Sequence, residues 1–157
     1  SNSSIEIKTM TITLALDLEG VLITNAISQF PRPGLMNFLN ECEKLFGRAN
    51  ICIFTTVDER RFRDIANRLV KDEYAPDWFS AIPYIDWVGE HKDLRFVADD
   101  ISKVIIVDDY PPYIKASQQH RLIQIKQYLD PYSHQLPDTT DKELLKIIEI
   151  LKTLISS

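Results

Sequence analysis

Two hydrophobic runs of this chain, at 11–16 and 104–107, are each followed by acidic residues. The four acids are Asp17 and Glu19 after the first run, and Asp108 and Asp109 after the second. Buried strands of parallel sheets are continuous apolar runs, and ligands of open α/β sheets bind beyond the carboxyl ends of such strands. Two carboxylates about 4 Å apart repel by roughly 4 kcal/mol at an effective dielectric constant of ~20. If the two strand ends meet, their acids therefore form a site that requires a cation.

A hydroxyl pair and a lysine lie between these acids in the chain. Thr55 and Thr56 follow the apolar run at 51–54, and Lys92 lies in a short charged segment. The order along the chain is thus an acid pair, a hydroxyl pair, a lysine and a second acid pair. Plainer interpretations stay open at this point, because a threonine can simply end a strand and a lysine among charged residues can belong to a solvated turn.

Apolar runs alternate along the chain with segments of helical periodicity. The four predicted strands lie at 11–16, 51–54, 104–107 and 122–125. One helix is predicted from Leu35 to Phe46 with an end at Gly47, and another is predicted to begin at Asp58, a residue type that caps helices. Alternating strands and helices imply a parallel sheet with right-handed crossovers. The expected fold class is therefore α/β with a doubly wound parallel sheet.

The C-terminal segment carries the clearest helical signal. Thr140 and Glu143 have the spacing of a capping box, and the apolar stripe that follows predicts a helix packed on the sheet. The stretch 74–94 is different, because Pro76 and Pro83 interrupt it and its aromatic residues show no steady period. We expect irregular chain with short strands there, with the aromatic residues either packing inside the fold or lining a peptide groove.

Length and composition fit one soluble globular domain. The chain has 157 residues, of which 45% are hydrophobic and 26% are charged, and a formal net charge of -5 argues against general nucleic-acid binding. No run approaches the length of a membrane span, and no secretory signal is evident. We expect a single domain at 11–157, with residues 1–10 as a tag remnant or a flexible N-terminus. Cys42 and Cys52 lack CxxC or zinc-type spacing, which favours a reducing, cytoplasmic location. The oligomeric state stays open.

The order of acids, hydroxyls and lysine resembles the haloacid dehalogenase (HAD) superfamily of phosphotransferases. Its motifs are an aspartate nucleophile at a strand end, a Thr or Ser, a Lys, and a paired acid. The closer resemblance is to the NLI-interacting-factor (FCP/SCP-type) phosphatases. The stretches that carry it are Asp17-Leu18-Glu19-Gly20-Val21-Leu22, Arg32-Pro33-Gly34, Ile53-Phe54-Thr55-Thr56, Lys92-Asp93-Leu94, and the run 101–109 followed by Pro111. This resemblance implies a HAD-like core with a minimal cap or none.

The resemblance also implies a magnesium site at the strand ends. Asp17 is then the nucleophile and forms an aspartyl-phosphate intermediate. The expected Mg²⁺ ligands are the Asp17 carboxylate, the backbone carbonyl of Glu19, and the pair Asp108 and Asp109, because a hard cation prefers oxygen ligands. Which acid of that pair binds the metal directly stays open.

Further roles follow from the same resemblance. Thr55, helped by the backbone amide of Thr56, is expected to hold a phosphate oxygen, and Lys92 to neutralise charge shared by the nucleophile and the phosphate. Glu19 is expected to protonate the leaving oxygen and then to deprotonate the attacking water. Only about 35 residues separate Thr55 from Lys92, too few for a full cap domain. An open site suits a phosphorylated macromolecule, and the family suggests a phosphoserine or phosphothreonine protein.

Glu19 departs from the family pattern, which has Asp at this position. The added methylene shifts a proton donor by about 1 Å, which can cost ~100-fold in rate. The alternative function is therefore a catalytically impaired binding module that keeps the fold and uses the surface around 74–87 for partner contacts. Asp109 stands where the closer family usually has Asn, which favours cation binding. A two-component receiver domain is a third alternative, but it places its acid pair on the first strand and its Lys last.

Overall fold

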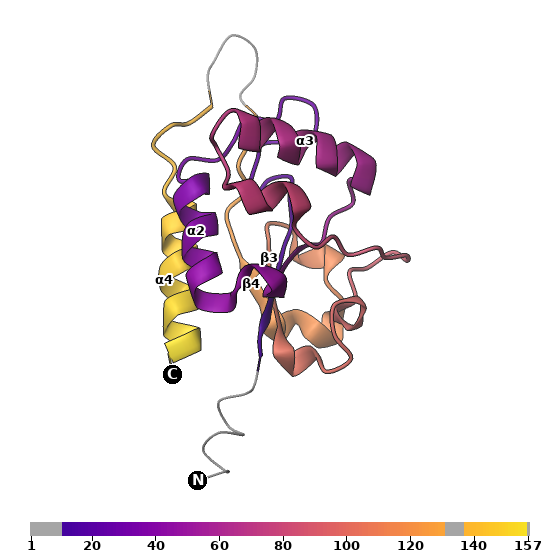
Figure 1. The fold of residues 1–157 in the computed structure, drawn as a ribbon. Helices are drawn as coiled ribbons and strands as arrows, with labels where there is room; N and C mark the ends of the chain where they lie inside the picture. Colours follow the sequence, from indigo (N-terminus) through magenta and orange to yellow (C-terminus); the bar gives the residue numbers. More distant parts are fainter. Residues whose placement is uncertain (1–10, 131–136, 157) are drawn as a thin grey trace.

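A computed structural model describes residues 11–130 and 137–156, which form a four-stranded parallel sheet with helices around it (Figure 1). The strands are β1 (Thr13–Leu16), β2 (Ile51–Ile53), β3 (Val104–Asp108) and β4 (Leu122–Gln124), in the order β2-β1-β3-β4. Every neighbouring pair runs parallel. The predicted strands and the predicted parallel α/β sheet are thus confirmed. The expectation for residues 1–10 lies outside the described residues.

Within the described ranges, the three α-helices pack into one hydrophobic core. They are α2 (Leu35–Phe46), α3 (Glu59–Lys71) and α4 (Glu143–Ser156). Their buried residues share a cluster with Leu14 and Leu16 of β1, and Figure 1 shows α2 and α4 side by side. As predicted, α2 ends at Gly47, whose φ of 81° suits glycine. Asp58 caps α3 by accepting a hydrogen bond from the Arg61 N–H at 2.9 Å.

Short 3-10 helices, rather than α-helices, cover the opposite face of the sheet. Ala15 and Ile106 lie on that face and belong to a second cluster with Leu94 and Ile114, against which Ile101 packs. The 3-10 helices on this face are η3 (Leu94–Phe96), η4 (Ile101–Lys103), η5 (Pro111–Tyr113) and η6 (Ala116–Arg121). Two others pack with the α-helices instead: η1 (Arg48–Asn50) contacts α2, and η2 (Asp77–Ala81) contacts α3. No helix in this part of the chain is both long enough and apolar enough to cross a bilayer.

Two local predictions were wrong. The stretch 74–94 is irregular, as predicted, but it contains η2 and isolated bridges at Tyr84 and Lys92 instead of short strands, because its prolines lack the N–H that a strand ladder needs. The predicted capping box does not form either. The Thr140 hydroxyl donates to the Asp138 carboxylate at 2.6 Å, and the Glu143 carboxylate pairs with Lys146 at 2.7 Å. The helix α4 instead begins at Glu143, beside α2.

Arg32 is the buried residue that fastens the start of α4 to the turn after β1. It is 1% exposed, and its Nε and Nη2 donate to the two carboxylate oxygens of Asp141 at 2.9 and 3.0 Å. Its Nη1 donates to the carbonyls of Gly20 and Val21 at 3.0 and 3.3 Å, and its Nη2 to that of Lys126 at 2.6 Å. A planar guanidinium is suited to such a set of acceptors. Arg32 therefore fixes the backbone immediately after Glu19.

We expect Arg32→Met to lower the free energy of unfolding by about 3–5 kcal/mol, because one carboxylate and three carbonyls lose a buried donor. Urea unfolding followed by circular dichroism measures the loss. The control is Lys146→Met, which removes a surface ion pair whose lysine side chain is 69% exposed and should cost far less. Equal small losses in the two variants would contradict a structural role for Arg32.

Candidate active site

The carboxyl ends of β1 and β3 place Asp17 and Asp108 beside one lysine. Leu16 pairs with Val107 in the parallel register, so the two chains leave the sheet at the same edge. The Lys92 ammonium lies between the two carboxylates, with its Nζ 3.1 Å from Asp17 Oδ1 and 2.6 Å from Asp108 Oδ2. Lys92 and Asp108 are 0% exposed, and Asp17 is 8% exposed. Three side chains from distant parts of the sequence thus form a buried ion cluster.

Lys92 reaches this position because its backbone pairs with a neighbouring segment. Its N–H donates to the Tyr113 carbonyl at 2.6 Å, and an isolated parallel bridge joins it to Ile114. Its Nζ also lies 5.7 Å from the centre of the Phe54 ring, within the range of a cation–π contact. Lys92 is therefore buried and paired, and it does not belong to a solvated turn.

Burial and crowding shift the pKa values of the cluster. Burial raises the pKa of Asp17 well above its usual value; Lys92 opposes the rise, while Asp108 and Asp109 add to it. Burial likewise raises the pKa of Asp109. For Lys92, burial lowers the pKa, but the charges of Asp17 and Asp108 outweigh it and the net shift is upward. The ammonium therefore stays charged, while Asp17 and Asp109 resist ionisation.

These three acids could also hold a metal ion. Each of Asp17, Asp108 and Asp109 offers one carboxylate oxygen, and the three oxygens lie within 4.8 Å of one another. Oxygen ligands with excess negative charge are the donor set that a hard divalent cation prefers. A bound cation would also favour the ionised acids. The residues present therefore fit Mg²⁺.

A cavity of about 320 Å³ opens beside the ion cluster. Asp17, Glu19, Thr56 and Asp109 line it, and further lining residues are Gly20, Thr24, Asn25, Tyr110, Tyr113 and Gln127. Gly20 has a φ of 76°, and a Cβ there would lie 2.8 Å from the Asp109 Cγ. Only glycine therefore allows the turn after Glu19 to approach the second acid pair so closely.

The two threonines that follow β2 occupy different positions. Thr55 is buried; its Oγ1 accepts a hydrogen bond from the Val57 N–H at 3.2 Å, and its carbonyl accepts one from Trp87 Nε1 at 2.8 Å. It lines a neighbouring hollow of about 420 Å³. Thr56 is exposed and lines both this hollow and the cavity beside Asp17. Thr56, and not Thr55, is therefore the threonine of this strand end that lines the cavity beside Asp17.

Glu19 lies at the same cavity but not in the ion cluster. Its Oε2 accepts a hydrogen bond from the Ala26 N–H at 2.7 Å, in the loop that follows the turn. The structure thus brings Asp17, Lys92 and Asp108 into direct contact, with Asp109 beside them. Around that core it arranges Glu19 and Thr56, and it places Thr55 one hollow away.

Sequence reasoning did not identify several residues that shape this site. The tyrosines at 110 and 113 line it and pack edge to face, with ring centres 4.6 Å apart, and Gly20 and Arg32 hold its turn. Gly20 and Arg32 lie in two of the stretches that carry the family resemblance, but neither was given a role in the site. The burial of Arg32 depends on Asp141, 109 positions later in the chain, and no local pattern reveals it.

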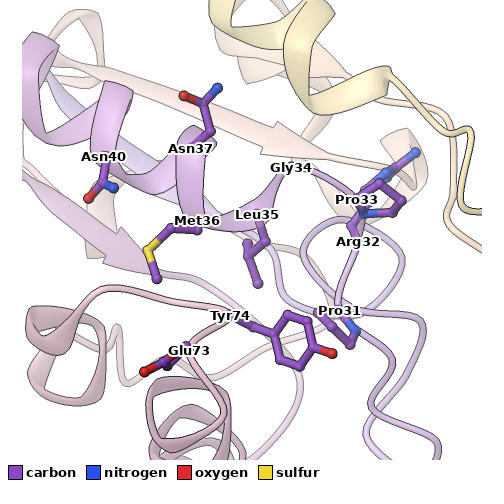
Figure 2. Close-up of a pocket in the computed structure, with 10 residues that line it drawn as sticks. All are labelled: Pro31, Arg32, Pro33, Gly34, Leu35, Met36, Asn37, Asn40, Glu73 and Tyr74. Atoms are coloured by element: carbon purple, nitrogen blue, oxygen red, sulfur yellow. The ribbon is translucent and has the colours of Figure 1, made fainter.

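A second hollow, of about 520 Å³, lies away from the acids, between the start of α2 and residues Glu73 and Tyr74 (Figure 2). Figure 2 shows that prolines, the first residues of α2 and the Tyr74 ring surround it. Of the residues that line it, only Glu73 is an acid, and the ion cluster is not among them. The candidate chemistry therefore belongs to the smaller cavity beside Asp17.

A parallel sheet with acids and a lysine at one edge is typical of HAD-type phosphotransferases. The chain belongs to the NLI interacting factor-like phosphatase family, whose sequence pattern matches residues 12–157. The resemblance inferred from the motifs is thereby confirmed.

Two related proteins show how far the similarity extends. The mitochondrial import inner membrane translocase subunit tim50 of Neurospora crassa is 28% identical over 153 residues, which cover 90% of this chain and only 26% of tim50. A solved structure of fission yeast RNA polymerase II CTD phosphatase Fcp1, a variant bound to beryllium fluoride, matches with a TM-score of 0.56. That match has 15% identity and covers 99% of this chain and 53% of the Fcp1 chain. At this identity it shows the fold alone.

We expect Asp109→Asn to stabilise the metal-free protein at neutral pH. A carboxyl whose folded pKa is raised contributes stability below its unfolded pKa and loses it as the pH rises through the folded pKa. Asparagine avoids that loss, so the gain should vanish in acid, where Asp109 is protonated as well. Thermal unfolding between pH 3 and 8 measures the difference, with about 3.9 as the ordinary aspartate value.

The same variant should respond less to magnesium. If Mg²⁺ binds the folded state, it should raise the unfolding midpoint of the wild type, and loss of one carboxylate ligand should reduce that rise. Asp99→Asn, which changes an exposed aspartate outside the site, is the control and should behave as the wild type. An unchanged magnesium response in Asp109→Asn would show that Asp109 is not a ligand.

Proposed function

We propose that this chain is a magnesium-dependent phosphomonoester phosphatase that acts through an aspartyl-phosphate on Asp17. The observation that carries the proposal is the Lys92 ammonium, which contacts both Asp17 and Asp108 at the carboxyl edge of the sheet. A structural salt bridge needs only one acid, whereas Lys92 contacts two carboxylates, and one of them, Asp17, lines an open cavity. Family membership supports the same reaction class.

Asp17 is the nucleophile in this proposal. One carboxylate oxygen attacks the phosphorus, the bond from phosphorus to the substrate oxygen breaks, and the phosphoryl group is transferred to Asp17. Water then attacks the phosphorus of the aspartyl-phosphate, which releases inorganic phosphate and restores the carboxylate. Lys92, 3.1 Å from Asp17 Oδ1, neutralises negative charge that would otherwise oppose the approach of the phosphate.

The two acids of the second pair have different tasks. Asp108 is fully buried, and its oxygens accept from Lys92 Nζ at 2.6 Å and from the Tyr110 N–H at 2.9 Å. Asp109 is only partly buried and lines the cavity. We therefore assign Asp108 to anchoring Lys92, and Asp109 to binding Mg²⁺ together with Asp17 and the Glu19 carbonyl. The chemistry that Mg²⁺ supplies when bound is neutralisation of the phosphoryl oxygens.

Glu19 and the end of β2 complete the proposed reaction. Glu19 protonates the leaving oxygen and later takes a proton from the attacking water. The exposed Thr56, which lines the cavity, holds a phosphate oxygen, and Thr55 fixes the following turn by accepting from the Val57 N–H. The stretch between Thr55 and Lys92 is too short for a full cap domain, and an open site suits a macromolecular substrate such as a protein phosphorylated on serine or threonine.

A second candidate function is a binding module without turnover. Two observations favour it: glutamate at position 19, and the 28% identity to a translocase subunit. In that case the fold and the cation site remain, and partner contacts involve the surface around 74–87. Tyr84 and Trp87 of that stretch are occupied, because they donate to the carbonyls of Val57 and Thr55 at 2.6 and 2.8 Å. Tyr74, at 48%, is the most exposed aromatic residue of that stretch.

Hydrolysis of an aryl phosphate with and without magnesium distinguishes the two functions. The wild type should release phosphate only with magnesium, and Asp17→Asn should lose activity on the order of 10³-fold or more, because the nucleophile is gone. Glu19→Gln should lose roughly 10²- to 10⁴-fold on a substrate with a poor leaving group.

The contrary result is specific. If the wild type shows no magnesium-dependent turnover of aryl phosphates or phosphopeptides while magnesium still raises its unfolding midpoint, the binding-module function replaces the phosphatase. Asp99→Asn serves again as the control for an unrelated charge change.

A further inference from the structure

The loop at 24–30, which follows the turn after Glu19, is held in a single shape by its own hydrogen bonds. The Asn25 Oδ1 accepts from the N–H groups of Ile27 and Ser28, each at 2.8 Å. Thr24 and Phe30 close the base of the loop, because the Thr24 N–H donates to the Phe30 carbonyl at 3.0 Å and the Phe30 N–H donates to Thr24 Oγ1 at 3.1 Å. These hydrogen bonds therefore fix the backbone conformation of the loop.

Two arginines of α3 hold this loop from outside. Arg61 Nη2 donates to the Ala26 carbonyl at 3.1 Å. Arg68 donates from Nη2 to the Gln29 carbonyl at 2.7 Å and from Nε to the Gln29 side chain at 3.0 Å. From the sequence these arginines suggest a solvated helix face or a contact with a phosphorylated macromolecule. In the structure they hold the loop beside Glu19.

Ala26 joins this loop to the candidate active site through its own N–H. That N–H donates to Glu19 Oε2 at 2.7 Å, while the carbonyl of the same residue accepts from Arg61. Glu19 also lines the cavity of Asp17 and Asp109. One carboxylate oxygen is therefore fixed by the loop, and the side chain is held at the edge of the cavity.

The length of the Glu19 side chain matches this arrangement. A C–C bond is about 1.5 Å long, so an aspartate at the same backbone position would draw the carboxylate back by about that much. A hydrogen bond of 2.7 Å would then fall outside the usual range. The glutamate that departs from the family pattern is thus the residue that this loop can hold.

We propose that Arg61 is a positioning residue that, through the Ala26 peptide, holds the Glu19 carboxylate in its working place. The proposal rests on the proposed phosphatase function, in which Glu19 is the general acid and base. Glu19, the loop at 24–30 and Arg61 then form one unit, and glutamate is the working residue at this position rather than an impairment.

A competing role for Arg61 is direct binding of the substrate. Arg61 is exposed and shares a hollow of about 270 Å³ with Glu19, Thr56 and Asp58. Direct binding predicts that loss of Arg61 raises KM for every phosphate ester. Positioning of Glu19 predicts a lower kcat without loss of substrate binding. The loss should be largest where the leaving group needs a proton, and it should disappear once Glu19 itself is replaced.

The test compares Arg61→Gln with the wild type on a phosphoserine peptide and on p-nitrophenyl phosphate. On the peptide, whose alcohol leaves poorly, kcat should fall roughly 10-fold, because a small displacement of a proton donor is costly. On the aryl phosphate, whose leaving group needs no proton, the fall should be smaller, because only the role of Glu19 as a base for the attacking water is affected. In the Glu19→Gln background, Arg61→Gln should have no further effect. Glu19→Asp should lower kcat on the peptide, and Arg60→Gln, an exposed arginine next to Arg61, should match the wild type.

A second measurement does not depend on turnover. Hydrogen exchange of the Ala26 amide, followed by NMR, should be slow in the wild type and at least several-fold faster in Arg61→Gln, with no change in Arg60→Gln. Measurement of the thermal midpoints of these variants checks that all of them are folded.

Two kinds of result overturn the proposal. One is a raised KM for both substrates, or an equal loss of kcat that persists when Glu19 is already glutamine. The other is an Ala26 amide that exchanges at the same rate with and without Arg61. A wild type that fails to turn over either substrate counts against the phosphatase function itself, and the amide measurement then still decides whether Arg61 holds Glu19 through Ala26.

Discussion

The site depends on the ion pairs that the buried Lys92 ammonium forms with Asp17 and Asp108. The Lys92 ammonium lies between the Asp17 and Asp108 carboxylates and neutralises them. Without this cation, two carboxylates at that depth would be costly to bury. The lysine can reach them because its backbone pairs with residues 113 and 114 on the second face of the sheet. The irregular chain on that face therefore positions the Lys92 side chain at the strand ends.

Other cations fix the backbone around this centre. Arg32 holds the turn after Glu19 from inside by donating to the carbonyls of Gly20 and Val21, and Asp141 balances its charge. Arg61 holds the following loop from α3. In each case a guanidinium binds backbone carbonyls, so the groups near the cavity are positioned before any substrate arrives. Such preorganisation is the main source of catalysis when the reaction depends on charge neutralisation.

Local patterns predicted the strands, the three α-helices and the shared edge, because apolar runs and helical periodicity depend on nearby residues. The parallel register then made the meeting of Asp17 with Asp108 predictable. The 3-10 layer was not predictable, because its segments are too short to show a period. Contacts such as Arg32 with Asp141 and Glu19 with Ala26 depend on the folded path. The functional roles of the site residues remain predictions from the family pattern and the geometry.

The most direct test of the account is to trap the phosphoryl group on the protein. The enzyme is mixed with a phosphopeptide and magnesium, quenched in acid during turnover and reduced with borohydride, which converts an aspartyl-phosphate to homoserine. Mass spectrometry of the digested protein then locates the modified residue. The account predicts homoserine in place of Asp17 alone, and only when both substrate and magnesium are present. Release of phosphate without any modification at Asp17, or modification of another acid, would contradict it.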